Sequence, residues 1–293
     1  MPPFNDVDIL IEGGTIVTMN PQRQVIDNGA ILVSGSTITA VMPVDQLPKG
    51  QKARKVIHAA GKVIIPGLIN AHSHLAMTLF RGFVEDLDLQ DWLAHVWKYE
   101  LTQVDAGSVY LGAKLAMAEM IRGGVTCAHD MYWHYQATMD LADELGFRLI
   151  SGPPITGIGG QAFDPMVAQA RKVLESMGQY RYVIPIIQAH STYTTDRRMM
   201  ETVLELKREF DVPFTTHASE NQAEVAEVVA KHGKTPIELL HAYQLLDAGT
   251  VLAHCVVLRP DEINLLCETG AQVVHCPESN LKIGSLRKTS WSF

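Results

Sequence analysis

Cysteine and positive charge are both scarce in this sequence of 293 residues. Its 4 cysteines include no C-x-x-C pair, which favours reduced thiols in a cytosolic protein over a disulfide framework. Lysine and arginine total 24 against 32 aspartates and glutamates, a formal net charge of −8. Nucleic acids and anionic membranes both attract basic surfaces, so we expect neither as a partner.

Long apolar runs are absent as well. No segment approaches the roughly 18 consecutive apolar residues of a membrane-spanning helix. Residues 1–10 lack the basic and apolar regions of a signal peptide, so we expect a cytoplasmic protein. Apolar residues nevertheless make up 47% of the chain, enough for a substantial core. The length suits one large domain or two ordinary ones.

The first part of the chain is rich in β-forming residues. Short segments of this kind, separated by glycine, asparagine and proline, predict strands at 7–11, 15–19, 30–34 and 37–41. No segment there has the length and period of a helix. We therefore predict a small β-sandwich module over residues 1–60, followed by a second domain over residues 61–293.

Beyond residue 61, apolar strand-like runs alternate with helical patterns. The runs predict strands at 63–70, 125–130, 147–151, 182–189, 212–217, 250–255 and 271–276. The segments between them predict helices at 104–122, 134–145, 164–177, 195–210, 220–232 and 261–268. Such alternation implies an α/β fold with a parallel sheet. Seven strands in this order favour a (β/α)8 TIM-type barrel whose eighth strand is missing.

Histidines end six of the seven predicted strands. His72 and His74 are one residue apart, so their side chains lie on the same side of a strand and can hold one metal ion together. The other strand-end histidines are His129, His190, His217, His254 and His275. Reactive groups of barrel enzymes lie at the carboxyl ends of the strands. Although any one histidine can be an ordinary polar residue, their convergence predicts a metal site.

The motifs resemble those of the amidohydrolase superfamily. They are PGLINAHSH at 66–74, MTLFRG at 77–82, HASE at 217–220, AHC at 253–255 and HCPESNLK at 275–282. Within the superfamily they are similar to the branch that contains methylthioadenosine/S-adenosylhomocysteine deaminases, guanine deaminases and triazine hydrolases. The resemblance implies metal ligands at His72, His74 and His217, catalytic roles for Glu220 and His254, and substrate contacts from Glu100, His190 and Glu220.

This resemblance also implies a reaction. Imidazole ligands suit one divalent ion, zinc first and iron second, and such an ion lowers the pKa of bound water to about 7. The resulting hydroxide attacks the carbon that bears the amino group, while Glu220 shuttles the proton. We expect hydrolytic deamination of a small amino-substituted N-heterocycle, such as a methylthioadenosine- or S-adenosylhomocysteine-like nucleoside or a related purine. Triazine chlorohydrolysis or aminohydrolysis is the alternative, and a homo-oligomer is compatible with the sequence.

Two departures from the family pattern change these expectations. The stretch 151–161 lacks the arginines that hold a substrate carboxylate in related deaminases. A neutral substrate is therefore as plausible as S-adenosylhomocysteine. Residues 285–293 do not resemble the eighth strand, whose aspartate binds metal in the family. We therefore expect a C-terminally truncated chain, with an inactive fragment as a further alternative. Weak activity and aggregation through exposed strand edges would follow.

Overall fold

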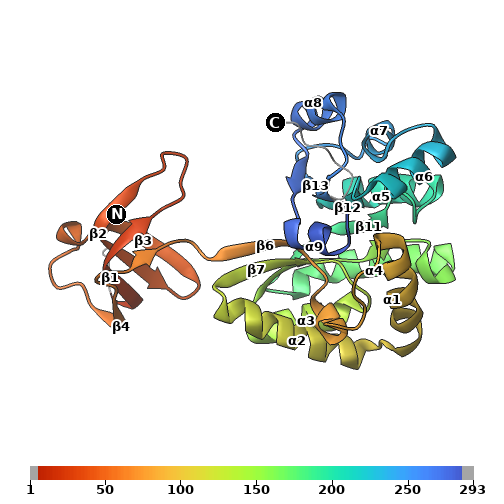
Figure 1. Ribbon diagram of the computed structural model, residues 1–293. Helices are drawn as coiled ribbons and strands as arrows, with labels where there is room; N and C mark the ends of the chain where they lie inside the picture. Colours follow the sequence, from red (N-terminus) through yellow and green to blue (C-terminus); the bar gives the residue numbers. More distant parts are fainter. Residues whose placement is uncertain (1–5, 286–293) are drawn as a thin grey trace. The chain divides into compact units, whose positions relative to one another are not determined.

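The computed structural model describes residues 6–285 and divides the chain into two compact units, Met1–Leu68 and Ile69–Phe293 (Figure 1). The boundary falls after Leu68, later than the boundary expected after residue 60. The expected anomalous segment at 285–293 lies almost entirely outside the described residues.

The first unit is built on one five-stranded sheet in the order β3-β2-β1-β4, with β5 also paired to β1. Its strands are β1 (Val7–Val17), β2 (Val25–Ser34), β3 (Thr37–Pro43), β4 (Ala53–His58) and β5 (Val63–Ile64), with a 3-10 turn at Val44–Gln46. The two strands predicted at 7–11 and 15–19 are one strand, because Gly13 at φ +87° lets β1 pass through an irregularity without ending. The β4 strand was not predicted.

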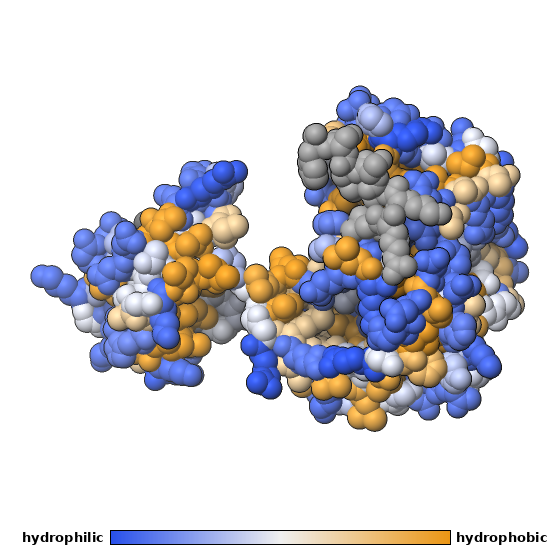
Figure 2. Space-filling view, in the orientation of Figure 1, coloured by the Kyte–Doolittle hydropathy of each residue, from blue (hydrophilic) through white to orange (hydrophobic). Residues whose placement is uncertain are grey.

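The sheet of the first unit packs a small core on one side. Val7, Leu10, Ala30 and Leu32 are buried there. Elsewhere in the unit, apolar side chains reach the surface, as Figure 2 shows. Ile38, Val41 and Ile65 are exposed there, and they line a groove whose walls also include the buried Ile16 and Ile31. This unit therefore buries only part of its apolar surface within the described residues.

The second unit contains a four-stranded sheet, β10-β8-β7-β6, and a five-stranded sheet, β14-β13-β12-β11-β9. Its strands are β6 (Leu68–Ser73), β7 (Val125–Asp130), β8 (Arg148–Ser151), β9 (Pro154–Ile155), β10 (Val183–Pro185), β11 (Ile187–Ser191), β12 (Phe214–Ala218), β13 (Thr250–His254) and β14 (Gln272–Val274). The pairs from β7 to β14 are parallel. Six of the seven strands predicted beyond residue 61 are thus present, and the α/β class is confirmed. The strand predicted at 63–70 is instead two strands, β5 and β6, which belong to different sheets and are separated by residues 65–67, where Pro66 has no N–H group to donate.

The chain passes from one of these two sheets to the other at two short breaks. The β8 strand continues into β9 and β10 continues into β11, with a break of one or two residues at which the chain changes sheets. Gly152 lies at one break, where a Cβ atom would stand 1.8 Å from the carbonyl oxygen of Ile186 at the other. Only glycine allows this close approach, and the approach joins both sheets into one curved wall.

Helices follow most of these strands. They are α1 (Leu89–Gln103), α2 (Ala106–Arg122), α3 (Tyr135–Leu145), α4 (Phe163–Ser176), α5 (Arg197–Glu209), α6 (Gln222–His232), α7 (Pro236–Ala242), α8 (Pro260–Thr269) and α9 (Pro277–Lys282). Short 3-10 turns occur at Leu75–Phe80, Ile158–Gly160 and Met177–Gln179. The six predicted helices are present, whereas α1, α7 and α9 were missed.

Local capping explains several helix starts. The side chains of Asp105, Asp196 and Asn221 accept hydrogen bonds from backbone N–H groups of the first turns of α2, α5 and α6. Two large clusters of apolar side chains lie between the helices and the sheets. No helix among residues 6–285 is both long and apolar enough to cross a membrane.

Candidate metal centre and active site

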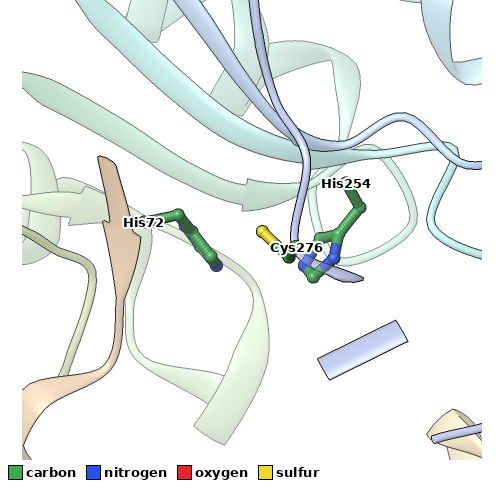
Figure 3. A group of neighbouring side chains, drawn as sticks. All are labelled: His72, His254 and Cys276. Atoms are coloured by element: carbon green, nitrogen blue, oxygen red, sulfur yellow. The ribbon is translucent and has the colours of Figure 1, made fainter. Parts of the chain in front are cut away.

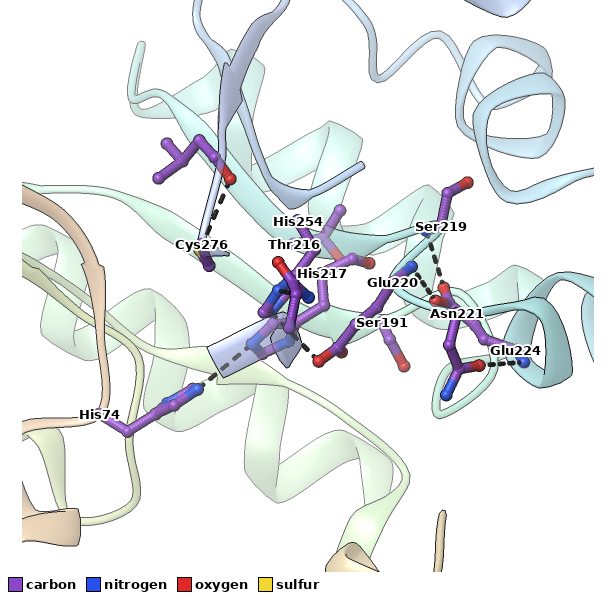
Figure 4. Close-up of polar contacts among 12 residues, drawn as sticks. His74, Ser191, Thr216, His217, Ser219, Glu220, Asn221, Glu224, His254 and Cys276 are labelled. Atoms are coloured by element: carbon purple, nitrogen blue, oxygen red, sulfur yellow. Dashed lines mark hydrogen bonds and ion pairs between the residues drawn. The ribbon is translucent and has the colours of Figure 1, made fainter. Parts of the chain in front are cut away.

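Three of the strand-end histidines converge on one point. The ligand atoms of His72 and His74 at the end of β6 and of His217 in β12 all lie within 4.8 Å of one another. The Nε2 atoms of His74 and His217 are 3.3 Å apart (Figure 4). The structure therefore brings together the three residues predicted to bind a metal ion, although His217 lies 143 residues beyond His74 in the chain.

The hydrogen-bond partners of the Nδ1 atoms determine whether the Nε2 atoms of His74 and His217 are protonated. Nδ1 of His217 lies 2.6 Å from the carbonyl oxygen of His190, and Nδ1 of His74 contacts the carbonyl oxygen of Met131. A carbonyl only accepts hydrogen bonds, so each Nδ1 carries a proton and each neutral ring presents a lone pair at Nε2. Two lone pairs that face each other at 3.3 Å repel unless a cation lies between them.

A proton is a poor candidate for that cation. Burial lowers the pKa of His74, and lowers the pKa of His217 well below its ordinary value. The Nδ1 atom of His72 is also buried and has no hydrogen-bond partner among the described residues. Neutral imidazoles whose other nitrogen is held by a carbonyl are typical zinc ligands. The three residues therefore fit a divalent metal ion.

Glu220 and His254 lie beside these histidines as a buried pair. Oε1 of Glu220 is 3.5 Å from Nε2 of His254, and each residue is at most 5% exposed. Burial, with a smaller effect of the Glu224 charge, raises the pKa of Glu220 to about 8. Burial lowers the pKa of His254 to about 4. At neutral pH the pair is thus a protonated carboxyl beside a neutral imidazole rather than an ion pair.

The orientation of His254 comes from α9. The side-chain amide nitrogen of Asn280 lies 3.0 Å from Nδ1 of His254 and donates to it. This contact leaves the ring proton on Nε2, where it is directed toward Glu220. A carboxyl group that holds its proton near neutral pH, next to a fixed hydrogen-bond donor, is suited to general acid–base chemistry.

The remaining predicted residues line an adjoining cavity. Glu100 projects from α1, is 7% exposed, and accepts hydrogen bonds from the Tyr132 hydroxyl at 2.6 Å and the Trp133 indole at 3.1 Å. His190, at the end of β11, lines this cavity too, and burial lowers its pKa to about 3. The walls of this cavity also include His74 and Trp97.

The cavity that contains Glu100, called the Glu100 cavity below, adjoins a second cavity beside the three metal-binding candidates, called the metal-side cavity. Both are lined by His74, Met77, Trp92, Leu93 and His190. The metal-side cavity adds His72, His217, Glu220, His254 and Cys276. Every residue predicted for the site therefore lines at least one of these two neighbouring cavities.

Some residues near the site were given no role by the sequence. Cys276 and Asn280 belong to the HCPESNLK motif, but only coordinates place the Cys276 sulfur within 4.8 Å of ligand atoms of His72 and His254 (Figure 3). Asp130 accepts a hydrogen bond from the Leu75 N–H group at 2.7 Å and so holds the turn after His74. Nδ1 of His129, in β7, lies 3.0 Å from the carbonyl oxygen of Ala71 in β6, so this histidine links two neighbouring strands.

Comparison with known proteins identifies the family. The sequence model of the amidohydrolase family matches residues 63–289. The chain belongs to the amidohydrolase family. The resemblance in the motifs is thereby confirmed, and the family relatives with solved structures confirm the TIM-barrel type of fold.

Several relatives of this amidohydrolase chain have names or solved structures. It is 34% identical over 282 residues to the 5-methylthioadenosine/S-adenosylhomocysteine deaminase of Nitratidesulfovibrio vulgaris, covering 95% of this chain and 64% of that one. It is 37% identical over 290 residues to the enzyme of the same name from Symbiobacterium thermophilum, covering 95% and 65%. The chain thus spans under two thirds of the length of these relatives.

Solved structures agree with the assigned fold. An adenosine deaminase from Xanthomonas campestris with bound zinc superposes with a TM-score of 0.91 at 32% identity, covering 96% of this chain and 65% of that one. A triazine hydrolase from Arthrobacter aurescens superposes with a TM-score of 0.87 at 21% identity, covering 94% and 66%. The second likeness concerns the fold alone.

Proposed function

We propose that this amidohydrolase is a metal-dependent deaminase that hydrolyses the amino group of an uncharged, purine-type nucleoside. The observation that carries the proposal is the pair of Nε2 atoms of His74 and His217, facing each other at 3.3 Å beside the buried Glu220–His254 pair. The deaminase names of the relatives at 34% to 37% identity support the same reaction.

His72, His74 and His217 would hold one divalent ion, zinc first because a relative at 32% identity was crystallised with it. When bound, such an ion supplies Lewis-acid chemistry and lowers the pKa of a water molecule toward neutrality. Glu220 delivers its proton to the ring nitrogen next to the attacked carbon and receives one from the incoming water. His254 donates its Nε2 proton in a hydrogen bond to the group under attack. Glu220 then carries the second proton of the added water to the amino nitrogen, so that ammonia leaves and a ring carbonyl remains.

The lining of the Glu100 cavity favours an uncharged substrate. Trp92, Trp97, Tyr132 and Trp133 offer flat apolar faces for a ring or a thioether, and among residues 6–285 no lysine or arginine lines this cavity. The Glu100 carboxylate is suited to accept hydrogen bonds from ribose hydroxyls. These features favour a methylthioadenosine-like substrate over S-adenosylhomocysteine, whose amino-acid tail carries a carboxylate.

Basic residues at the metal-side cavity are already engaged. Arg81 forms hydrogen bonds to both carboxylate oxygens of Glu119 at 3.0 and 2.7 Å, and Lys282 pairs with Glu85 at 2.9 Å. An anionic substrate group would have to displace one of these acids. This arrangement also favours a neutral ligand.

An assay of ammonia release tests the proposal. Zinc-loaded protein is incubated with methylthioadenosine, adenosine, S-adenosylhomocysteine and guanine, and chloride release from a chlorotriazine is followed in parallel. We expect ammonia from the neutral nucleosides, loss of activity on chelation, and recovery on addition of zinc.

Two histidine variants compare the effect of a change at the predicted metal site with that of a change on the surface. His217→Ala is expected to lose both bound metal and activity, whereas His241→Ala, on the exposed side of α7, keeps both. Release of chloride from the chlorotriazine without release of ammonia from any nucleoside would show that the enzyme is a dehalogenase and not a deaminase. No product from metal-loaded protein with any of these substrates would refute the proposal.

A further inference from the structure

A second buried carboxylate, Glu224, supports the backbone that carries Glu220. Glu224 lies in the first turn of α6 and is 1% exposed. Its Oε1 accepts a hydrogen bond from the N–H group of Ser219 at 3.1 Å, and its Oε2 accepts one from the N–H group of Glu220 at 2.6 Å (Figure 4). Neither the family motifs nor the proposed reaction assigns this residue a role.

These contacts differ from an ordinary helix cap. The N-cap of α6 is Asn221, whose side chain already accepts the N–H group of Glu224 at 2.8 Å. A glutamate in a capping box bonds back to the N–H group of the N-cap residue itself. The Glu224 carboxylate instead reaches past the N-cap to the two residues before it, in the turn between β12 and α6.

That turn is strained and is bonded to a second turn. Ser219 has φ +52°, a left-handed conformation that costs energy for any residue with a Cβ atom. Its carbonyl oxygen accepts the N–H groups of Val256 and Val257, both at 2.9 Å. Immediately before them, His254 at φ +77° and Cys255 at φ +47° are left-handed as well. The segments that carry Glu220 and His254 are therefore coupled through Ser219.

We propose that Glu224 is a positioning residue, whose carboxylate fixes the Ser219–Glu220 turn and thereby aligns Glu220 with His254. The inference rests on the proposed deaminase function, in which these two side chains touch the substrate. Glu224 itself lines neither of the two cavities. Its effect on the reaction is therefore indirect, through two backbone hydrogen bonds.

The test compares Glu224→Gln with Glu227→Gln, which changes an exposed glutamate one turn further along the same helix. A glutamine offers only one carbonyl oxygen, so its NH₂ group must face one of the two N–H donors. Removing an outer contact of a metal ligand lowers activity about 10- to 100-fold, and we expect a loss of similar size for a contact that holds Glu220. We expect this loss in kcat with little change in KM and with full metal content, whereas Glu227→Gln behaves like the wild type.

Amide hydrogen exchange provides a readout that does not depend on activity. The N–H groups of Ser219 and Glu220 should exchange faster in Glu224→Gln than in Glu227→Gln. If exchange at both amides is unchanged, the positioning role is wrong, even if the deaminase activity is real. If exchange is faster only in Glu224→Gln but the wild type deaminates nothing, the proposed function is wrong and the contact role stands.

A third variant distinguishes positioning from general weakening of the helix start. Asn221→Ala removes the N-cap and leaves the carboxylate in place, so it should lower the melting temperature while kcat stays near the wild-type value. A loss of kcat as large as that of Glu224→Gln would overturn the inference. The same comparison decides the matter if Glu224→Gln proves too unstable to purify, because a stable, active Asn221→Ala then assigns the defect to the carboxylate.

Discussion

Replacing Glu220 by glutamine should strongly lower activity and, at the same time, stabilise the metal-free protein relative to the wild type as the pH rises toward 8. Burial raises the pKa of Glu220 from 4.5 to about 8. Between these values the folded protein keeps a proton that the unfolded chain releases, so the free energy of unfolding falls as pH rises. Each pH unit costs about 1.4 kcal/mol, which amounts to about 2.5 kcal/mol between about pH 5 and about pH 7.

Urea unfolding of metal-free wild type and Glu220→Gln at a series of pH values measures this effect. Other titrating groups are common to both proteins, so their contributions cancel in the difference. The unfolding free energy of Glu220→Gln minus that of the wild type should rise with pH up to about 8 and then level off. Activity should fall by about 10²- to 10⁴-fold, the usual contribution of a general acid–base group. Parallel stability curves would show that Glu220 is ionised in the folded protein, and the proton-donor role would then be wrong.

Two further predictions concern the wall and the metal-side cavity. Gly152→Ala places a methyl group 1.8 Å from a backbone carbonyl oxygen and should lower the free energy of unfolding by about 3 kcal/mol or more. The control Gly178→Ala adds a methyl group in open space and should leave the free energy of unfolding nearly unchanged. The Cys276 sulfur lies near two imidazoles, so added Cd²⁺ should give a sulfur-to-cadmium ultraviolet absorption band. This band should be lost in Cys276→Ser and kept in Cys267→Ser, which changes an exposed cysteine of α8. A band that survives Cys276→Ser would place the cadmium elsewhere.

The strands of the second unit could be predicted because each is a short, strongly apolar run. Phe214–Ala218 is buried at every position, and such runs stand out against the amphipathic helices around them. Their histidines could be predicted as a cluster for the same reason, because parallel strands end at one rim. The same logic fails in the first unit, where β4 exposes five of its six residues and carries no apolar pattern.

The division of strands between two sheets could not be predicted. Residues 182–189 form one apolar run in the sequence, but β10 ends at Pro185 and β11 begins at Ile187 in the other sheet. The cause is the approach of Gly152 to the backbone of Ile186, a contact between residues far apart in sequence. Helix α1 was missed because its buried face, Leu89, Leu93 and Val96, also includes Glu100, a charged residue whose partners come from another part of the chain.

The chemical roles of the histidines depend on atoms that the sequence does not specify. His74 and His217 each have a backbone carbonyl at Nδ1, so their Nε2 atoms present lone pairs suited to a cation. His254 has the Asn280 amide at Nδ1, so its Nε2 atom presents a proton toward Glu220. Three imidazoles within one cavity are thereby divided into two cation-binding groups and one hydrogen-bond donor. Motifs identify which histidines meet, but only the partner of the second ring nitrogen decides whether each can bind a metal ion or donate a proton.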